Sequence, residues 1–223
     1  MKKVDFSGKF DAIVCLDAVL PGKFFFTGMK NLPLLAADGA ALKLFDMGIT
    51  PDYVIGDLDT FLKDERAGLF DRNRVIQISD QNSNDFEKTL ITASNKSFNN
   101  LLITGFQGGE LEHTLNNWSV FKKYSSKMQL CIYDCARYGI VVSGDVEINL
   151  TKGEIVSVLP QPEMVLTTEN LLWELKEDKL ALGIREGARN RTTSDKIRLY
   201  VYSGEGLVFF NDRLPFAPLF QEA

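Results

Sequence analysis

The sequence predicts an α/β domain followed by an all-β domain. Between residues 11 and 133, short apolar runs alternate with segments of helical composition, which is typical of a mainly parallel sheet covered by helices. After Tyr138 the chain contains short β-prone runs broken by Gly, Pro, Asn or Asp, which indicates a sandwich. We therefore expect a three-layer, Rossmann-like domain over residues 1–142 and a smaller β-sandwich domain over residues 143–223.

Composition places the chain among soluble globular proteins. It has 223 residues, of which 45% are hydrophobic and 25% charged. The net charge of -5 argues against a nucleic-acid-binding surface. No apolar run is long enough to span a bilayer and the N-terminus does not resemble a signal peptide, so we expect a cytoplasmic protein without a membrane partner. The odd number of cysteines, Cys15, Cys131 and Cys135, indicates reduced, structural thiols.

Residues 36–60 contain the strongest functional pattern. An apolar run ends in Asp38 and Gly39, a helical segment follows and stops at Gly48, and a second apolar run ends in Gly56 and Asp57. This pattern predicts strand, helix, strand. Because parallel sheets collect ligands at the carboxyl ends of their strands, both strands would bring a carboxylate to the same edge.

Asp57 and Asp59 flank a single residue. Their side chains can converge on one hard cation, and Gly56 allows a ligand to approach the backbone. The pattern favours a site for magnesium and phosphate. Asp and Gly are also common in ordinary turns, so an Asp-x-Asp motif alone leaves a purely structural interpretation open.

The remaining elements follow the same alternation. Further strands are expected at 11–16, 75–78, 101–104 and 128–133, and further helices at 61–70, 86–93 and 111–124. In the second domain, strands are expected at 139–143, 146–150, 154–159, 164–168, 179–182, 197–202 and 207–210. The Pro-rich segment 215–218 is expected to be a packed or frayed tail.

Two loops that precede helices add polar candidates. Asn84 with Glu87 forms a capping-box pattern, which would put Asp85 among the free N–H groups of a first helical turn. Lys88 either neutralises a phosphate or is a solvated helix lysine. The glycine-rich turn 105–109 allows close approach of a nucleotide, and His113, the only histidine, follows it.

These motifs together resemble the thiamine pyrophosphokinase family. The resemblance is strong from Ala36 to Thr114 and looser from Gly139 onward. Its motifs are Ala37-Asp38-Gly39-Ala40, Gly56-Asp57-Leu58-Asp59-Thr60, the segment 80–88, Gly108-Gly109-Glu110-Leu111-Glu112-His113 and Asn170-Leu171-Leu172-Trp173.

The resemblance implies transfer of diphosphate from ATP to the hydroxyethyl group of thiamine, with Mg²⁺, giving thiamine diphosphate and AMP. It also implies a homodimer with sites between subunits. From general acid–base chemistry, either Glu112 or Asp85 is a candidate for accepting the substrate proton, and the sequence does not choose between them. The resemblance also implies three groups of site residues. The catalytic and metal-binding residues are Asp57, Asp59 and Asp85. The ATP-binding residues are Asp38, Gly39, Gln81, Asn84, Lys88, Gly108, Glu112 and His113, and the substrate-binding residues are Trp173 and Asn190.

The chain departs from the family pattern at several positions. Glu110 replaces an Arg, Glu112 replaces an Asp, Leu172 replaces a Lys, and Arg189 lies in a segment that is Ser/Thr-rich in the family. Three alternatives therefore stay open: a diphosphokinase for another heterocyclic alcohol such as a pterin, a catalytically impaired nucleotide- or thiamine-binding protein, and a glycosyltransferase that uses its Asp-x-Asp motif.

Overall fold

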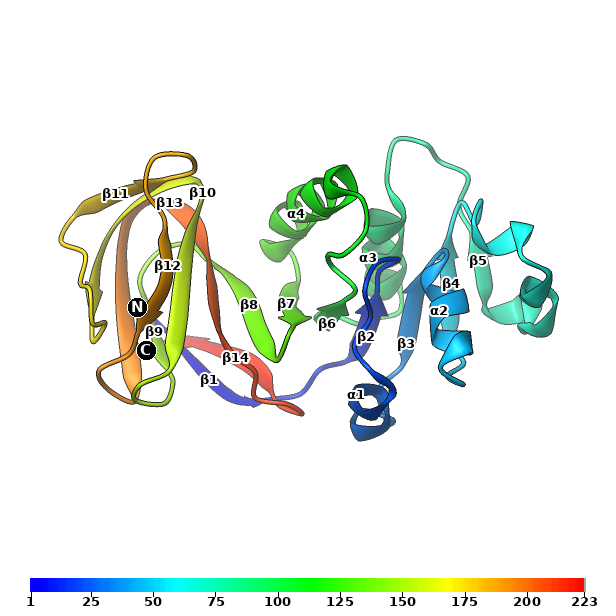
Figure 1. The fold of residues 1–223 in the computed structure, drawn as a ribbon, viewed down its shortest axis with the longest axis horizontal. Coiled ribbons are helices and arrows are strands. Elements are labelled where there is room, and N and C mark those ends of the chain that lie inside the picture. The colour runs from blue at the N-terminus through cyan, green and yellow to red at the C-terminus, as the bar shows by residue number, and fades with distance from the viewer. Residues whose placement is uncertain (223) are drawn as a thin grey trace. The chain divides into compact units, whose positions relative to one another are not determined.

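The computed structural model describes residues 1–222, which form two compact units (Figure 1). One unit is Phe10–Cys135; the other combines Met1–Lys9 with the chain from Ala136 onward. This division differs from the expected boundary after residue 142. Strand β1 (Lys2–Gly8) pairs with β14 (Ala217–Glu222) and with β9 (Val146–Asn149), and β8 (Arg137–Val142) pairs with β13 (Lys196–Asn211), so both strands belong to the β-rich unit.

The first unit contains a parallel sheet with the strand order β5-β4-β3-β2-β6-β7. Every pairing within it is parallel. Its central strands are short apolar runs that are buried on both faces, as expected for a sheet covered by helices. The strands are β2 (Ala12–Cys15), β3 (Leu34–Ala37), β4 (Tyr53–Gly56), β5 (Val75–Gln77), β6 (Asn100–Thr104) and β7 (Gln129–Asp134).

The helices of this unit connect its parallel strands. The chain steps outward from β2 to β5 and then returns to β6 on the other side of β2. Helix α3 contacts β3, β4 and α4. None of the helices in residues 1–222 is long and apolar enough to cross a membrane. The helices are α1 (Lys23–Gly28), α2 (Ala40–Asp46), α3 (Asp85–Asn95) and α4 (Leu111–Ser125).

The prediction of an α-helix at 61–70 is wrong. Residues 61–70 form two short 3₁₀ turns, at Phe61–Lys63 and Glu65–Leu69, and a third follows at Arg72–Arg74. The carboxylate of Asp64 accepts the N–H of Arg66, and that of Asp71 accepts the N–H of Asn73. Each aspartate therefore caps a new turn, and the chain restarts instead of continuing one helix.

The second unit is a network of mostly antiparallel strands. The order β14-β1-β9-β13-β8 is extended by β10, which pairs with β13, β11 and β12; the β1–β9 pairing is parallel. Its further strands are β9 (Val146–Asn149), β10 (Ile155–Glu169), β11 (Asp178–Ala181), β12 (Gly187–Arg191), β13 (Lys196–Asn211) and β14 (Ala217–Glu222).

Several strands of this unit are longer than expected. β10 and β13 each continue across a break that the sequence suggested, because shifts of register between Pro160 and Met164 and between Val165 and Leu166 absorb the irregularity. The C-terminal segment, expected to be a packed or frayed tail, ends in β14, which pairs with β1. The chain as a whole is a mixed α/β protein, as predicted.

Candidate active site

A cavity of about 680 Å³ lies at the carboxyl ends of the parallel strands, within the first unit. It is bordered by the segments that follow β2, β3, β4 and β6 and by the first turns of α3 and α4. Seven carboxylates and neither Lys nor Arg are among its lining residues in the described chain. The carboxylates are those of Asp17, Asp38, Asp57, Asp59, Asp85, Glu110 and Glu112.

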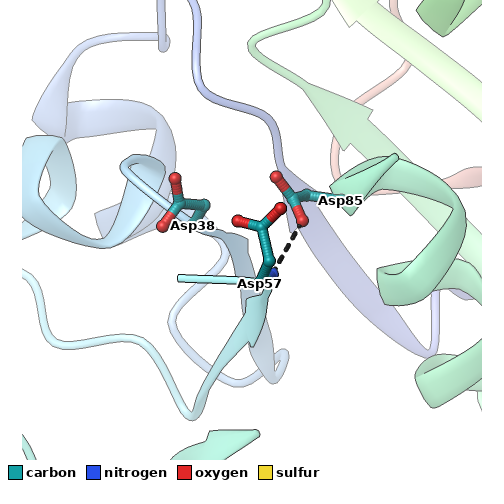
Figure 2. Close-up of side chains that lie close together, drawn as sticks. All are labelled: Asp38, Asp57 and Asp85. Atoms are coloured by element: carbon teal, nitrogen blue, oxygen red, sulfur yellow. Dashed lines mark hydrogen bonds between the residues drawn. The ribbon is translucent and has the colours of Figure 1, made fainter. Parts of the chain in front are cut away.

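Three of these carboxylates converge (Figure 2). One oxygen from each of Asp38, Asp57 and Asp85 lies within 4.8 Å of the others. The parallel register of β3 and β4 pairs Ala37 with Ile55, so the residues after each strand meet at one edge of the sheet. Helix α3 supplies the third carboxylate from its first turn.

Asp85 is positioned by the start of α3. The side chain of Asn84 caps the helix by accepting the N–H of Glu87 at 2.8 Å, which confirms the predicted cap. The Oδ1 atom of Asp85 then accepts the N–H of Asp57 at 3.1 Å and the ammonium of Lys88 at 3.1 Å. The first turn of α3 is thereby joined to the end of β4.

Asp38 is held from the opposite side. It is 6% exposed and has a positive φ of 41°, which is rare for a residue other than glycine. Its carboxylate accepts the N–H groups of Thr60 at 3.2 Å and Phe61 at 2.9 Å. These bonds close the loop that carries Asp57 and Asp59, so Asp38 both contributes an oxygen to the cluster and orders the neighbouring loop.

Lys88 lies beneath the cluster and is almost fully enclosed. Its side chain is 2% exposed, and its Nζ lies 3.1 Å from Asp85 Oδ1 and 3.6 Å from Asp57 Oδ2. Of the two interpretations drawn from the sequence, the one in which Lys88 is a solvated helix lysine is therefore wrong. Lys88 is also not among the residues that line the cavity, so it neutralises carboxylates rather than facing a ligand there.

The surroundings move the pKa values of two cluster members in opposite directions. Burial raises the pKa of the Asp85 carboxyl, and the hydrogen bonds from Asp57 and Lys88 offset only part of this effect. For Asp57, burial also acts to raise the pKa, but the N–H of Asp59 and the charge of Lys88 outweigh it, so the pKa lies below its ordinary value.

The donor set fits a hard divalent cation. Carboxylate oxygens are the protein ligands that Mg²⁺ prefers, and it commonly takes its remaining ligands from phosphates and water. The three converging aspartates differ from the predicted set of Asp57, Asp59 and Asp85, since Asp38 takes the place of Asp59. Asp59 lines the cavity, and its N–H donates to Asp57 Oδ1 at 3.2 Å.

The predicted ATP-binding residues divide into two groups. Asp38, Asn84, Glu112 and His113 line the cavity. The lining residues of the described chain do not include Gly39, Gln81, Lys88 or Gly108. Both glycines meet other groups closely: a Cβ at residue 39 would lie 2.3 Å from Asp17 Oδ2, and one at residue 108 would lie 2.3 Å from Val19 Cγ2.

Glu110, the departure from the family arginine, also lines the cavity. Its Oε2 lies 3.4 Å from Nε2 of His113, and both side chains are exposed. The pair puts an anionic group at the start of α4, where the family pattern has a cation.

The sequence interpretation missed several lining residues, among them Asp17, Thr60, Phe106 and Asn117. Asp17 lies two residues after the end of β2 and directly after the strand expected at 11–16, and its Oδ1 forms a 2.7 Å ion pair with Lys43. The argument that singled out Asp38, a carboxylate directly after a buried strand, applies to Asp17 equally.

The predicted substrate residues meet at a second cavity, of about 140 Å³, in the β-rich unit. The N–H of Trp173 donates to Asn190 Oδ1 at 3.2 Å, and Asn190 Nδ2 donates to the carbonyl of Trp173 at 2.7 Å. Asn190 is 9% exposed, whereas Trp173 is 63% exposed. The buried asparagine therefore fixes the backbone that presents an accessible indole.

Fold and site together define a class: an α/β protein whose parallel sheet carries an acidic ligand site at the carboxyl ends of its strands. Residues 30–132 match the family described as "Thiamin pyrophosphokinase, catalytic domain". Over these residues the chain is similar to the catalytic domain of thiamine pyrophosphokinases, which confirms the resemblance drawn from its motifs. No curated protein sequence matches the chain.

Solved structures show the same fold over most of the chain. Yeast thiamin pyrophosphokinase superposes with a TM-score of 0.76 at 17% identity, covering 91% of this chain and 86% of that one. The enzyme from Geobacillus thermodenitrificans gives 0.74 at 16% identity, with coverages of 92% and 98%. The enzyme from Bacillus subtilis gives 0.72 at 18% identity, with coverages of 91% and 100%.

Proposed function

We propose that this protein is a thiamine pyrophosphokinase, which transfers diphosphate from ATP to the hydroxyethyl oxygen of thiamine and releases AMP. The observation that carries the proposal is the convergence of Asp38, Asp57 and Asp85 inside a matching catalytic domain. Transfer of a diphosphate needs charge neutralisation and in-line positioning more than covalent chemistry by the protein. A carboxylate cluster that holds Mg²⁺ meets this need.

The charge of the cavity supports a metal-bound nucleotide. Among residues 1–222, its lining contains seven carboxylates and lacks Lys and Arg, so it would repel the phosphates of free ATP. Mg²⁺, held by Asp57, Asp85 and either Asp38 or Asp59, would neutralise charge on the transferring group. Asn84, Glu112 and His113 are our candidates for contacts with the nucleotide.

The small cavity of the β-rich unit is our candidate for the thiamine site. The exposed face of Trp173 offers a surface for the cationic thiazolium or the pyrimidine ring of thiamine. Arg185 lines this cavity, but its Nη1 forms a 2.8 Å ion pair with Asp178. Glu186 also lines this cavity and accepts the backbone N–H of Gly183 at 2.8 Å, and its carboxylate would favour a cationic ligand.

The two cavities belong to different units, and we propose that they act together in a homodimer with sites between subunits, as the family resemblance implies. The α/β unit would then bind ATP and Mg²⁺, and the β-rich unit would bind thiamine and contribute to dimerisation. A cytoplasmic location stays a prediction.

A test with several acceptors distinguishes the alternatives. The purified protein is incubated with ATP, Mg²⁺ and either thiamine or a hydroxymethylpterin, and the products are separated by chromatography. We expect a diphosphorylated product with thiamine only. Product with the pterin alone would instead support a diphosphokinase that acts on another heterocyclic alcohol. Binding of a UDP-sugar in preference to ATP would instead support a glycosyltransferase.

A further inference from the structure

Lys88 is a buried charge whose partners belong to the candidate metal site. It is among the largest fully buried side chains of the described chain, on a helix that packs against β3 and β4. Burying an ammonium is unfavourable unless it is paired, and its recorded partners are the carboxylates of Asp57 and Asp85. Because its side chain is enclosed and absent from the cavity lining, it would not reach a phosphate there.

The same carboxylates face a repulsion that Lys88 offsets. Three oxygens from Asp38, Asp57 and Asp85 lie within 4.8 Å of one another, and like charges at this separation repel strongly in a partly buried setting. Asp38 is compensated by two backbone N–H groups. Within residues 1–222, Lys88 is the cationic side chain that lies within ion-pair distance of both Asp57 and Asp85.

We propose that Lys88 is a positioning residue that acts as a built-in counter-ion: it keeps the carboxylates of Asp57 and Asp85 converged while the metal is absent. The inference rests on the Mg²⁺ site of the proposed function. Lys88 approaches both carboxylates from within the protein, so the aspartates stay arranged for a cation that enters from the cavity.

The proposal has two opposite consequences for a variant without this charge. Lys88→Met would leave the aspartate cluster uncompensated, so the metal-free protein would be less stable than the wild type. Bound Mg²⁺ takes over the counter-ion role and holds the carboxylates together itself. Because the variant also lacks a positive charge that repels the cation, Mg²⁺ would bind at least about tenfold more tightly. Since a ligand stabilises the folded state in proportion to its affinity, Mg²⁺ would raise the melting temperature of Lys88→Met more than that of the wild type.

The experiment measures melting temperatures of both proteins over a range of MgCl₂ concentrations, without nucleotide. Lys123→Met is the matched control. The Nζ of Lys123 lies 2.5 Å from Oε1 of Glu87, which is not a member of the cluster, and the Lys123 side chain is 57% exposed. We expect the control to respond to MgCl₂ as the wild type does. Equal responses of Lys88→Met and wild type would overturn the counter-ion role while leaving the metal site intact. No response in any of the proteins would overturn both.

A double variant keeps the test decisive if Lys88→Met alone does not fold. Asp57→Asn with Lys88→Met removes one negative charge along with the positive one. We expect this protein to be more stable without metal than Lys88→Met and to respond weakly to MgCl₂. A double variant as unstable as the single one would show that Lys88 acts through packing alone, and would overturn the proposal.

Discussion

The backbone N–H of Asp57 donates a 3.1 Å hydrogen bond to Oδ1 of Asp85, which joins the end of β4 to the first turn of α3 (Figure 2). The two residues are 28 positions apart in the chain. The bond fixes the orientation of the Asp85 carboxylate. Its position therefore depends on the backbone of Asp57 as well as on its own helix.

Removing the charge of a cluster carboxylate should abolish most activity. We expect Asp57→Asn and Asp85→Asn each to lower kcat/KM at least about 100-fold, because each would lose an anionic ligand of the proposed Mg²⁺ site. Circular dichroism should show an intact fold. Asp46→Asn, a change at an exposed ion pair with Arg66, is the matched control and should keep its turnover. A near-normal rate in either cluster variant would remove that residue from the metal site.

Gly56 should not tolerate a side chain. A Cβ at this position would lie 2.9 Å from Oδ1 of Asp85 and 3.3 Å from the Cβ of Asp38. Because Asp85 is held by Asp57 and Lys88, it cannot turn aside without breaking those bonds. We expect Gly56→Ala to lower kcat and to weaken the response of the melting temperature to Mg²⁺. Gly68→Ala, with no atom within 4 Å of the added Cβ, should match the wild type in both measurements.

Binding of ATP should require a divalent cation. The carboxylates that line the cavity repel a polyphosphate, and Mg²⁺ neutralises both partners. We expect calorimetric affinity for ATP to fall at least about 100-fold when EDTA replaces Mg²⁺. Unchanged affinity in EDTA would mean that the nucleotide binds away from this cavity.

Trp173 should contribute to binding of thiamine more than to binding of ATP. Its indole is exposed beside the small cavity of the β-rich unit. We expect Trp173→Ala to raise the KM for thiamine about tenfold or more, through loss of stacking, with a smaller effect on the KM for ATP. Phe24→Ala, at an aromatic side chain that is 93% exposed, controls for loss of a surface ring. Equal effects on both KM values would make Trp173 structural.

The β-rich unit should lose stability in acid through Glu147. Burial acts to raise the pKa of this carboxyl, but Arg198 at 2.8 Å and Lys196 at 3.1 Å outweigh it and hold the pKa below its ordinary value. A pKa lowered by folding contributes stability above the unfolded-state value, near 4.5, that is lost as the pH falls through the folded-state value. The stability difference between wild type and Glu147→Gln in urea titrations should therefore shrink below about pH 4.5. A difference that is constant with pH would contradict the ion-pair account.

Local signals predicted the parts of the fold and site that local chemistry determines. Asn84 and Glu87 predicted the start of α3 because a cap requires only neighbouring residues. The strands before Asp38 and Asp57 could be predicted because each is a short apolar run that ends in an Asp or Gly. Parallel pairing of those strands then accounts for the approach of the two carboxylates.

Long-range pairing accounts for what the sequence did not predict. The side chain of Asp38 accepts backbone N–H groups more than 20 positions away, and nothing near Asp38 in the chain indicates these two bonds. Likewise, β1 pairs with β14 across the whole length of the chain. The burial of Lys88 follows from how α3 packs, since a lysine one turn after an aspartate is also typical of an exposed helix.

The central claim is diphosphate transfer to thiamine, and the most direct measurement is the ratio of nucleotide and thiamine products. The protein is mixed with ATP, Mg²⁺ and thiamine, and AMP, ADP and thiamine phosphates are quantified together. We predict AMP and thiamine diphosphate in equal amounts, with no product from Asp85→Asn. ADP with thiamine monophosphate, or no thiamine product at any Mg²⁺ concentration, would contradict the account.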